Sequence, residues 1–230
     1  MRVSIIGAGN TEYHYQELLS IPKEKMDDQI AGLAKALADV GAELAVTPDR
    51  GIPFAVAERY KAFGGKKVYG TVPVSDKTYG IKHLQDFMNE EVNGKKIVDE
   101  VIDTHTWYEQ DVAKCIFGEV ILVLAYSLGS MGELSLGYYI YKLASGQKLE
   151  QVVPIEKIHP QAVAGKRFPL ATIVYMPFVK ERLPLEIEAY INKFGGVVHY
   201  VHTVSEMVSA YKKIEKKHML DDSIKEKNGN

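Results

Sequence analysis

Short runs of aliphatic and β-branched residues alternate along the chain with longer stretches in which apolar residues recur at helical spacing. The first helical stretch shows the pattern, because Ile30, Leu33 and Leu37 share one stripe of a helix that Gly41 ends. Strands are predicted at residues 3–7, 43–47, 68–72, 97–102, 120–125, 171–176 and 197–201. Helices are predicted at residues 27–40, 53–63, 82–93, 107–117, 132–143, 185–194 and 204–214. Residues 145–169 show little periodicity and predict an excursion such as a hairpin.

Repeated alternation of strand and helix predicts an α/β fold, with a mostly parallel central sheet and helices on both faces. We expect a single domain over residues 1–220 and a polar, disordered tail over residues 221–230. Proteins with such sheets bind ligands outside the carboxyl ends of the strands. The turns after Ile6, Thr47, Val72 and Ala125 are therefore the places where we expect the chemistry.

Composition narrows the class of protein mainly by exclusion. The chain has 230 residues, of which 46% are hydrophobic and 25% charged, and these are ordinary values for a globular protein. The formal net charge of −2 lacks the basic excess of a nucleic-acid-binding protein. No apolar run is long enough for a membrane helix, and the first apolar run is too short for a signal peptide. We expect a soluble, cytoplasmic protein.

Cysteine and histidine give no indication of a metal site. Cys115 is the only cysteine, so it cannot form an internal disulfide or a cysteine-based metal site by itself. His199 and His202 lie three residues apart at the end of a predicted strand, where alternation sends them to opposite faces. We predict neither a bound metal nor a cofactor.

A glycine-containing turn follows the first predicted strand and reads Gly7-Ala8-Gly9-Asn10-Thr11-Glu12. The third glycine of the dinucleotide-binding fingerprint is absent, Glu12 taking its place, and no predicted helix follows at once. We interpret the turn as a loop that lets a ligand approach the backbone closely. Glu12 and His14, which follow the glycines, are further candidates for the wall of a pocket.

A second turn of small residues runs from Ala125 to Leu134, where a predicted strand ends and a helix begins. Free backbone N–H groups and the helix dipole at such a place can hold a phosphate. Ser130 and Glu133 have the spacing of a capping box, in which Glu133 would only stabilise the helix start. The alternative is that Glu133 faces the ligand, where a carboxylate can stabilise positive charge on a sugar.

Two motifs in the chain resemble those of the Lonely Guy (LOG) and lysine-decarboxylase-like family, within the SLOG superfamily of nucleotide-binding proteins. The family's first signature combines a glycine-rich turn, a helix and a strand that ends in proline. Here it is matched by Gly51-Ile52-Pro53-Phe54-Ala55-Val56-Ala57 and by Gly64-Gly65-Lys66-Lys67-Val68-Tyr69-Gly70-Thr71-Val72-Pro73. The second signature, PGGxGTxxE, is matched in its latter half by Gly129-Ser130-Met131-Gly132-Glu133.

The resemblance implies a Rossmann-like fold, a homodimer or higher homo-oligomer, and a nucleotide-type ligand. Family members with both signatures hydrolyse the N-glycosidic bond of nucleoside 5′-monophosphates, which makes Glu133 the matching catalytic carboxylate. The chain departs from the family where an Arg-Lys pair is expected, because Gln110-Asp111 occupies that position. A neutral Gln110 cannot supply the charge of an arginine, although Arg50 in a neighbouring turn could compensate.

The first hypothesis is therefore an enzyme that hydrolyses or transfers at the N-glycosidic bond of a nucleoside monophosphate. The alternative is a nucleotide sensor or carrier of the SLOG type that has no turnover. Both hypotheses place the ligand on the same residues, with Gln110, Glu12 and His14 as further candidates. The predicted nucleotide-binding residues are Gly7, Ala8, Gly9, Asn10, Arg50, Gly51, Ser127, Gly129, Ser130, Met131 and Gly132.

Overall fold

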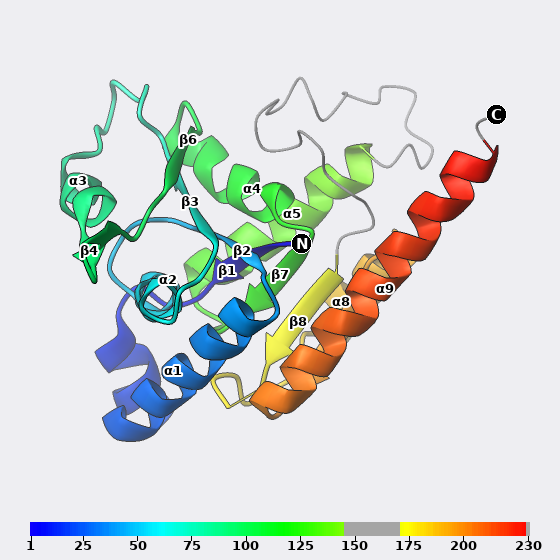
Figure 1. Ribbon diagram of the computed structural model, residues 1–230, viewed down its shortest axis with the longest axis horizontal. Helices are drawn as coiled ribbons and strands as arrows, with labels where there is room; N and C mark the ends of the chain where they lie inside the picture. The colour runs from blue at the N-terminus through cyan, green and yellow to red at the C-terminus, as the bar shows by residue number, and fades with distance from the viewer. Residues whose placement is uncertain (145–170, 229–230) are drawn as a thin grey trace.

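The computed structural model describes residues 1–144 and 171–228, and within these ranges seven parallel strands form one sheet (Figure 1). The strand order is β6-β3-β2-β1-β7-β8-β9. A separate two-stranded hairpin consists of β4 (Glu91–Val92) and β5 (Lys95–Lys96). The strands of the main sheet are β1 (Arg2–Ile6), β2 (Glu43–Val46), β3 (Lys67–Val72), β6 (Glu100–Asp103), β7 (Val120–Val123), β8 (Ala171–Tyr175) and β9 (Val197–Val201).

Helices cover both faces of the sheet. In Figure 1, α1 (Lys23–Asp39) and α9 (Val204–Asn228) lie on the near face, and α4 (Trp107–Phe117) and α5 (Leu128–Ala144) lie behind the sheet. The remaining helices are η1 (Glu12–Leu18), α2 (Ile52–Ala62), α3 (Lys82–Asn89) and α8 (Leu185–Lys193). This is the Rossmann-like α/β architecture, so the predicted fold class is confirmed.

The strands are apolar because both of their faces are buried. Side chains alternate along a strand, and β7 shows the consequence. Val120 and Leu122 belong to one hydrophobic cluster, which also includes residues of α1, α2 and α9. Ile121 and Val123 belong to a second cluster with residues of α5 and α8. Two cores, one on each side of the sheet, therefore hold the layers together.

Several element boundaries differ from the prediction. The π-helical turn η1 begins directly after the first glycine loop, where no helix was expected. The helix predicted at residues 82–93 ends at Asn89, because Asn93 and Gly94 adopt positive φ angles of 54° and 71° in the turn of the β4–β5 hairpin. An Asn-Gly pair is a strong hairpin signal that the helical period obscured. β6 begins at Glu100 rather than at residue 97.

Two further expectations concern the ends of the described ranges. The excursion predicted at residues 145–169 lies outside the described residues. Helix α9 continues to Asn228, so it includes most of the segment expected to be a disordered tail. That segment contains no helix-breaking residue before Gly229. In the part of the chain that the structure describes, no helix has the length and apolar character needed to cross a membrane.

Candidate functional site

A pocket lies at the carboxyl edge of the sheet, where the strand order reverses around β1. Such a switch point leaves a crevice between the loops that diverge from it. The pocket has a volume of about 500 Å³ and is open to solvent on one side. Its lining comes from the loops after β1 and β2 and from helices α4 and α5, and consists of Gly7, Gly9, Thr47, Asp49, Arg50, Pro53, Trp107, Tyr108, Gln110, Asp111, Lys114, Glu133 and Leu136.

The loops after β1 and β2 form one wall by packing directly against each other. The backbone N–H of Ile52 donates to the carbonyl of Ala8 at 3.1 Å. Gly51 has a φ of 126°, and a Cβ atom there would lie 2.6 Å from the Cα of Gly9. A Cβ atom on Gly7 would lie 2.5 Å from a methyl group of Ile52. Gly7 and Gly51 therefore permit contact between the loops, and Gly9 is the exposed glycine that a ligand can approach.

An ion pair forms the floor of the pocket. The Nζ atom of Lys114 on α4 lies 2.5 Å from Oε1 of Glu133 on α5. Their side chains are only 4% and 11% exposed. Lys114 also donates to the hydroxyl of Thr47, just after β2, at 3.2 Å. The pair thus ties the two helices on this face of the sheet to the end of a central strand.

A second carboxyl group, that of Asp111, completes the charged cluster. Burial raises the pKa of Glu133 to about 7, although the charge of Lys114 opposes the shift. Burial also raises the pKa of Asp111, and Lys114 and a hydrogen bond with Glu133 oppose that shift. Both carboxyl groups are therefore protonated more readily than exposed ones, and Glu133 is partly protonated near neutral pH.

The charge of Lys114 is retained in this environment. Burial by itself would lower the pKa of Lys114, but the neighbouring Glu133 more than offsets that effect and raises it. Among the described residues, Oε2 of Glu133 is buried without a hydrogen-bond partner to donate to it. The floor of the pocket is thus a lysinium ion beside a carboxyl pair that has acceptor capacity left over.

Gln110 is the residue that stands where the resemblance implies an arginine. It is buried, and its Nε2 donates to the hydroxyl of Thr47 and, at 3.4 Å, to that of Thr71. The pocket obtains its cation from Lys114, one turn further along α4. The sequence interpretation missed Lys114 and Asp111. The signal that would have found them is the helical period, which puts Trp107, Asp111 and Lys114 on one face of α4.

The start of α5 differs from the predicted arrangement. The helix begins at Leu128, and Ser127 rather than Ser130 stands before it. The amide of Ser130 donates to Oγ of Ser127 at 3.2 Å, and the amide of Ser127 donates to Oγ of Ser130 at 2.8 Å. The reciprocal capping pair is therefore Ser127 with Ser130, so the capping box of Ser130 with Glu133, one of the two alternatives, is not formed. Glu133 is left free to face α4.

Only some of the predicted site residues line this pocket. Gly7, Gly9, Arg50, Gln110 and Glu133 do so. Several others contact residues next to the lining. Ala8 and Gly51 take part in the contact between the loops, and Ser127 and Ser130 cap α5. Residues Gly129, Met131 and Gly132 lie in the first turns of α5 and are not among the lining residues.

The remaining candidates from the first loop belong to η1. The side-chain oxygen of Asn10 accepts from the amide of Tyr13 at 3.0 Å and so supports the start of that turn. Glu12 is exposed there. His14 is buried edge-on against Tyr15 with 4.8 Å between ring centroids, and burial lowers its pKa. His14 and Glu12 do not line the pocket.

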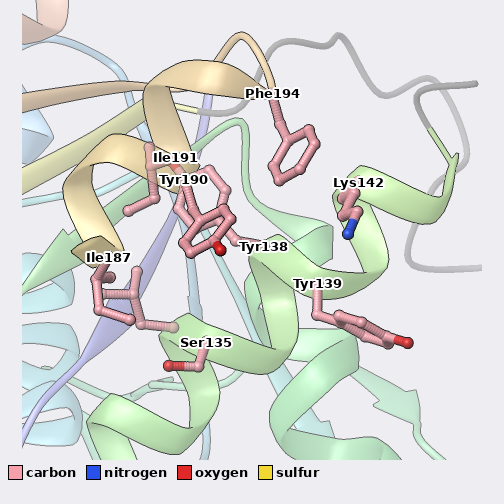
Figure 2. Close-up of a pocket in the computed structure, with 9 residues that line it drawn as sticks. Ser135, Tyr138, Tyr139, Lys142, Ile187, Tyr190, Ile191 and Phe194 are labelled. Atoms are coloured by element: carbon pink, nitrogen blue, oxygen red, sulfur yellow. The ribbon is translucent and has the colours of Figure 1, made fainter. Parts of the chain in front are cut away.

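A second pocket lies between α5 and α8 and is mostly apolar (Figure 2). Its volume is about 320 Å³. Figure 2 shows Tyr138 and Tyr139 of α5, Tyr190 of α8 and Phe194 just after α8 around it, with Lys142 at one side. Among the described residues, no carboxylate lines this pocket. It is a different kind of surface from the charged pocket.

Fold and pocket together describe a Rossmann-like α/β protein with a polar pocket at the carboxyl edge of its sheet. No family model matches the chain, and no curated protein does. Among solved structures, the molybdenum cofactor carrier protein of Chlamydomonas reinhardtii is similar, with a TM-score of 0.54 and 15% identity, over 94% of this chain and 98% of that one.

Two other solved structures are similar to the same degree. The molybdenum cofactor binding protein of the phototrophic bacterium Rippkaea orientalis has a TM-score of 0.53 at 14% identity, over 93% of this chain and 96% of that one. The structural-genomics target TM1055 has a TM-score of 0.57 at 14% identity, over 92% and 98%. At these identities the comparisons show the shared fold. Membership of the Lonely Guy family stays a prediction.

Proposed function

We propose that the protein is a carrier or sensor that binds a small phosphate-bearing ligand, of nucleotide or pterin type, in the carboxyl-edge pocket without turning it over. This is the alternative that the sequence analysis left open. The observation that carries the proposal is the Lys114–Glu133 ion pair, with its 2.5 Å separation and its burial. A carboxylate that is already paired inside the protein is poorly placed to stabilise a new positive charge on a sugar.

The geometry of the pocket supports binding. A volume of about 500 Å³ is within the range of pockets that hold small ligands. Arg50 is exposed at the pocket, where a guanidinium can bind a phosphate in bidentate fashion. Two of the similar structures are named as carrier or binding proteins of the molybdenum cofactor. This chain shares their fold and has a polar pocket of its own, which supports a carrier of a small ligand.

One observation favours the hydrolytic hypothesis as a second candidate. Burial raises the pKa of both Asp111 and Glu133, and that of Glu133 to about 7. Such a pair can supply both a general acid and a general base at neutral pH. N-Glycosidic hydrolysis needs both roles, so a release assay must accompany every binding measurement.

The decisive experiment measures binding and base release on the same samples. We expect nucleoside monophosphates or the molybdenum cofactor to raise the unfolding free energy, by about 2.7 kcal/mol at a hundredfold excess over the Kd. Chromatography should detect no free base from the nucleotides. Arg50→Ala should weaken binding about tenfold through loss of the phosphate contact. Arg59→Ala, on the exposed side of α2, is the matched control and should bind like wild type.

The outcomes separate the two candidates. If wild type releases free base with turnover and Glu133→Gln does not, the hydrolase hypothesis is supported and the carrier hypothesis is wrong. Binding without release, retained in Glu133→Gln, supports the carrier. If neither nucleotides nor the molybdenum cofactor stabilised the protein, the proposed function would be wrong.

We further propose that the α5–α8 face joins two copies of the chain, as the predicted homo-oligomer requires. Tyr139 is 56% exposed and Tyr190 59% exposed on this face, and both line its apolar pocket. Large apolar side chains gathered in this way are typical of an interface. Light scattering coupled to size exclusion should give at least a dimer for wild type. Tyr190→Glu should shift the protein to monomer, and Tyr108→Glu, at the other pocket, should not.

A further inference from the structure

The mouth of the carboxyl-edge pocket carries an aromatic rim, which consists of Tyr79, Trp107 and Tyr108. Trp107 and Tyr108 line the pocket from the first turn of α4. Tyr108 is 76% exposed and Tyr79 is 65% exposed, and their hydroxyl oxygens lie 3.4 Å apart. Such exposure leaves most of the apolar surface of both rings in water, and burying that surface under a ligand is favourable.

The rim is held in place by a network of backbone contacts. The amide of Trp107 donates to Oδ2 of Asp76 at 3.1 Å, and its indole N–H donates to the carbonyl of Gly80 at 3.2 Å. Oδ1 of Asp76 accepts from the amides of Thr78 and Tyr79 at 2.7 and 3.2 Å. The loop that contains Tyr79 and the start of α4 are thereby fixed to each other.

A stacking partner adds to this arrangement. The ring of His83 lies nearly parallel to that of Trp107, with 5.3 Å between centroids and 14° between planes. Thr106 caps α4 by accepting from the amide of Glu109 at 3.2 Å, which fixes the position of the first turn. The Trp107 ring is therefore oriented before any ligand arrives, so little of its conformational entropy is lost when a ligand stacks on it.

We propose that the pocket is specific for ligands with a planar heteroaromatic ring, which stacks on Trp107 and Tyr108 while the phosphate lies toward Arg50. This inference rests on the proposed ligand-binding function and names the class of ligand. Aromatic platforms bind heteroaromatic rings through their π faces and tolerate different bases. A sugar phosphate without a heteroaromatic ring fits the polar part of the pocket but leaves the aromatic rim in water. The ring is thus the part of the ligand that determines selection.

Trp107 is the single tryptophan of the chain, so its fluorescence reports on the rim directly. The experiment titrates wild type with adenosine monophosphate, guanosine monophosphate and ribose 5-phosphate, and follows tryptophan emission and thermal stabilisation together. We expect both nucleotides to quench the emission and to bind about 5- to 100-fold more tightly than ribose 5-phosphate. Ribose 5-phosphate should leave the emission unchanged.

Variants separate stacking from folding effects. Tyr108→Leu changes an exposed side chain, so it should fold normally and lose about 5-fold or more in nucleotide affinity, with no loss for ribose 5-phosphate. Trp107→Phe should retain most of the nucleotide affinity, and Trp107→Leu should not. Tyr139→Leu, an exposed tyrosine outside this pocket, is the control and should bind nucleotides like wild type.

Two results would overturn the inference, and they are distinguishable. In the first, nucleotides stabilise the protein without changing its tryptophan emission and bind Tyr108→Leu as tightly as wild type. This result would contradict the ring subsite but would still support ligand binding in the pocket. Equal affinity for ribose 5-phosphate and the nucleotides would have the same meaning. In the second, neither the three ligands nor the molybdenum cofactor stabilise the protein. This result would contradict the proposed function and therefore also the ring subsite.

Discussion

Replacing Lys114 by methionine is expected to lower the unfolding free energy by about 3 kcal/mol at pH 8 and by only about 1 kcal/mol at pH 5. Methionine keeps the apolar length of the side chain, so the change removes chiefly the charge and its hydrogen bonds to Glu133 and Thr47. A buried carboxyl pair then has no internal cation. Chemical denaturation at the two pH values, followed by circular dichroism, measures the difference.

The sign of the pH dependence follows from the direction of the Glu133 shift. Its folded pKa of about 7 is above the ordinary value of 4.5, so its contribution to stability falls as the pH rises between these values. Lys114 opposes that shift, and its removal raises the pKa of Glu133 further. The pH range in which Glu133 lowers the stability of the folded protein then extends to higher pH. At pH 5 Glu133 is protonated in the folded protein, and the lost hydrogen bonds of Lys114 are the main remaining cost.

Lys61→Met provides the matched control for that variant. The Lys61 side chain is 7% exposed and lies 2.9 Å from a carboxylate oxygen of Asp99. Asp99, however, is 32% exposed, so water can hydrate its carboxylate once the lysine is gone. Lys61→Met should therefore cost about 1 kcal/mol, with the same value at both pH values. Equal losses at pH 5 and pH 8 in Lys114→Met would contradict the raised pKa of Glu133 and its dependence on Lys114.

The part of the site that could be predicted from the sequence is the part that local motifs define. Gly9 and Glu133 stand at fixed places after β1 and β7, where small residues mark a strand that ends at a ligand edge. Arg50 was found in the same way, from the turn after β2. Short apolar runs, each followed by a stretch with a period of 3.6, were enough to predict the parallel sheet and the helices that cover it.

The residues that were missed depend on tertiary structure. Helix α4 joins β6, at the edge of the sheet, to β7 near its centre, and so passes over the pocket on its way. The helical period shows which residues of α4 share a face, but the local sequence does not indicate which face lies toward the pocket. Lys114 and Trp107 therefore could not be distinguished from other helix residues. The residues that cap α5 could not be identified from the sequence for a related reason. Both serines have capping chemistry at the right spacing, and the end of β7 decides which of them begins the helix.

Gly51 is the position where a single methyl group should cost most. Its φ of 126° and ψ of 179° lie in a region that only glycine adopts readily. The added Cβ would also lie 2.6 Å from the Cα of Gly9 and 2.7 Å from the carbonyl oxygen of Ala8. Those atoms belong to backbone that cannot rotate away. Gly51→Ala is therefore expected to lower the unfolding free energy by about 3–4 kcal/mol, from backbone strain and overpacking together.

The control for Gly51→Ala is Gly41→Ala, which separates the strain of a positive φ from the contact between the loops. Gly41 has a φ of 66°, and a Cβ atom there would have nothing within 4 Å, so this variant should lose only about 1 kcal/mol. Gly51→Ala should also weaken ligand binding, because relief of the contact moves Gly9 at the edge of the pocket, whereas Gly41→Ala should bind normally. Similar losses of stability in the two variants would mean that the loops after β1 and β2 can separate at little cost. The wall of the pocket would then be adjustable, and the close packing of Gly9 against Gly51 would not be what positions the ligand.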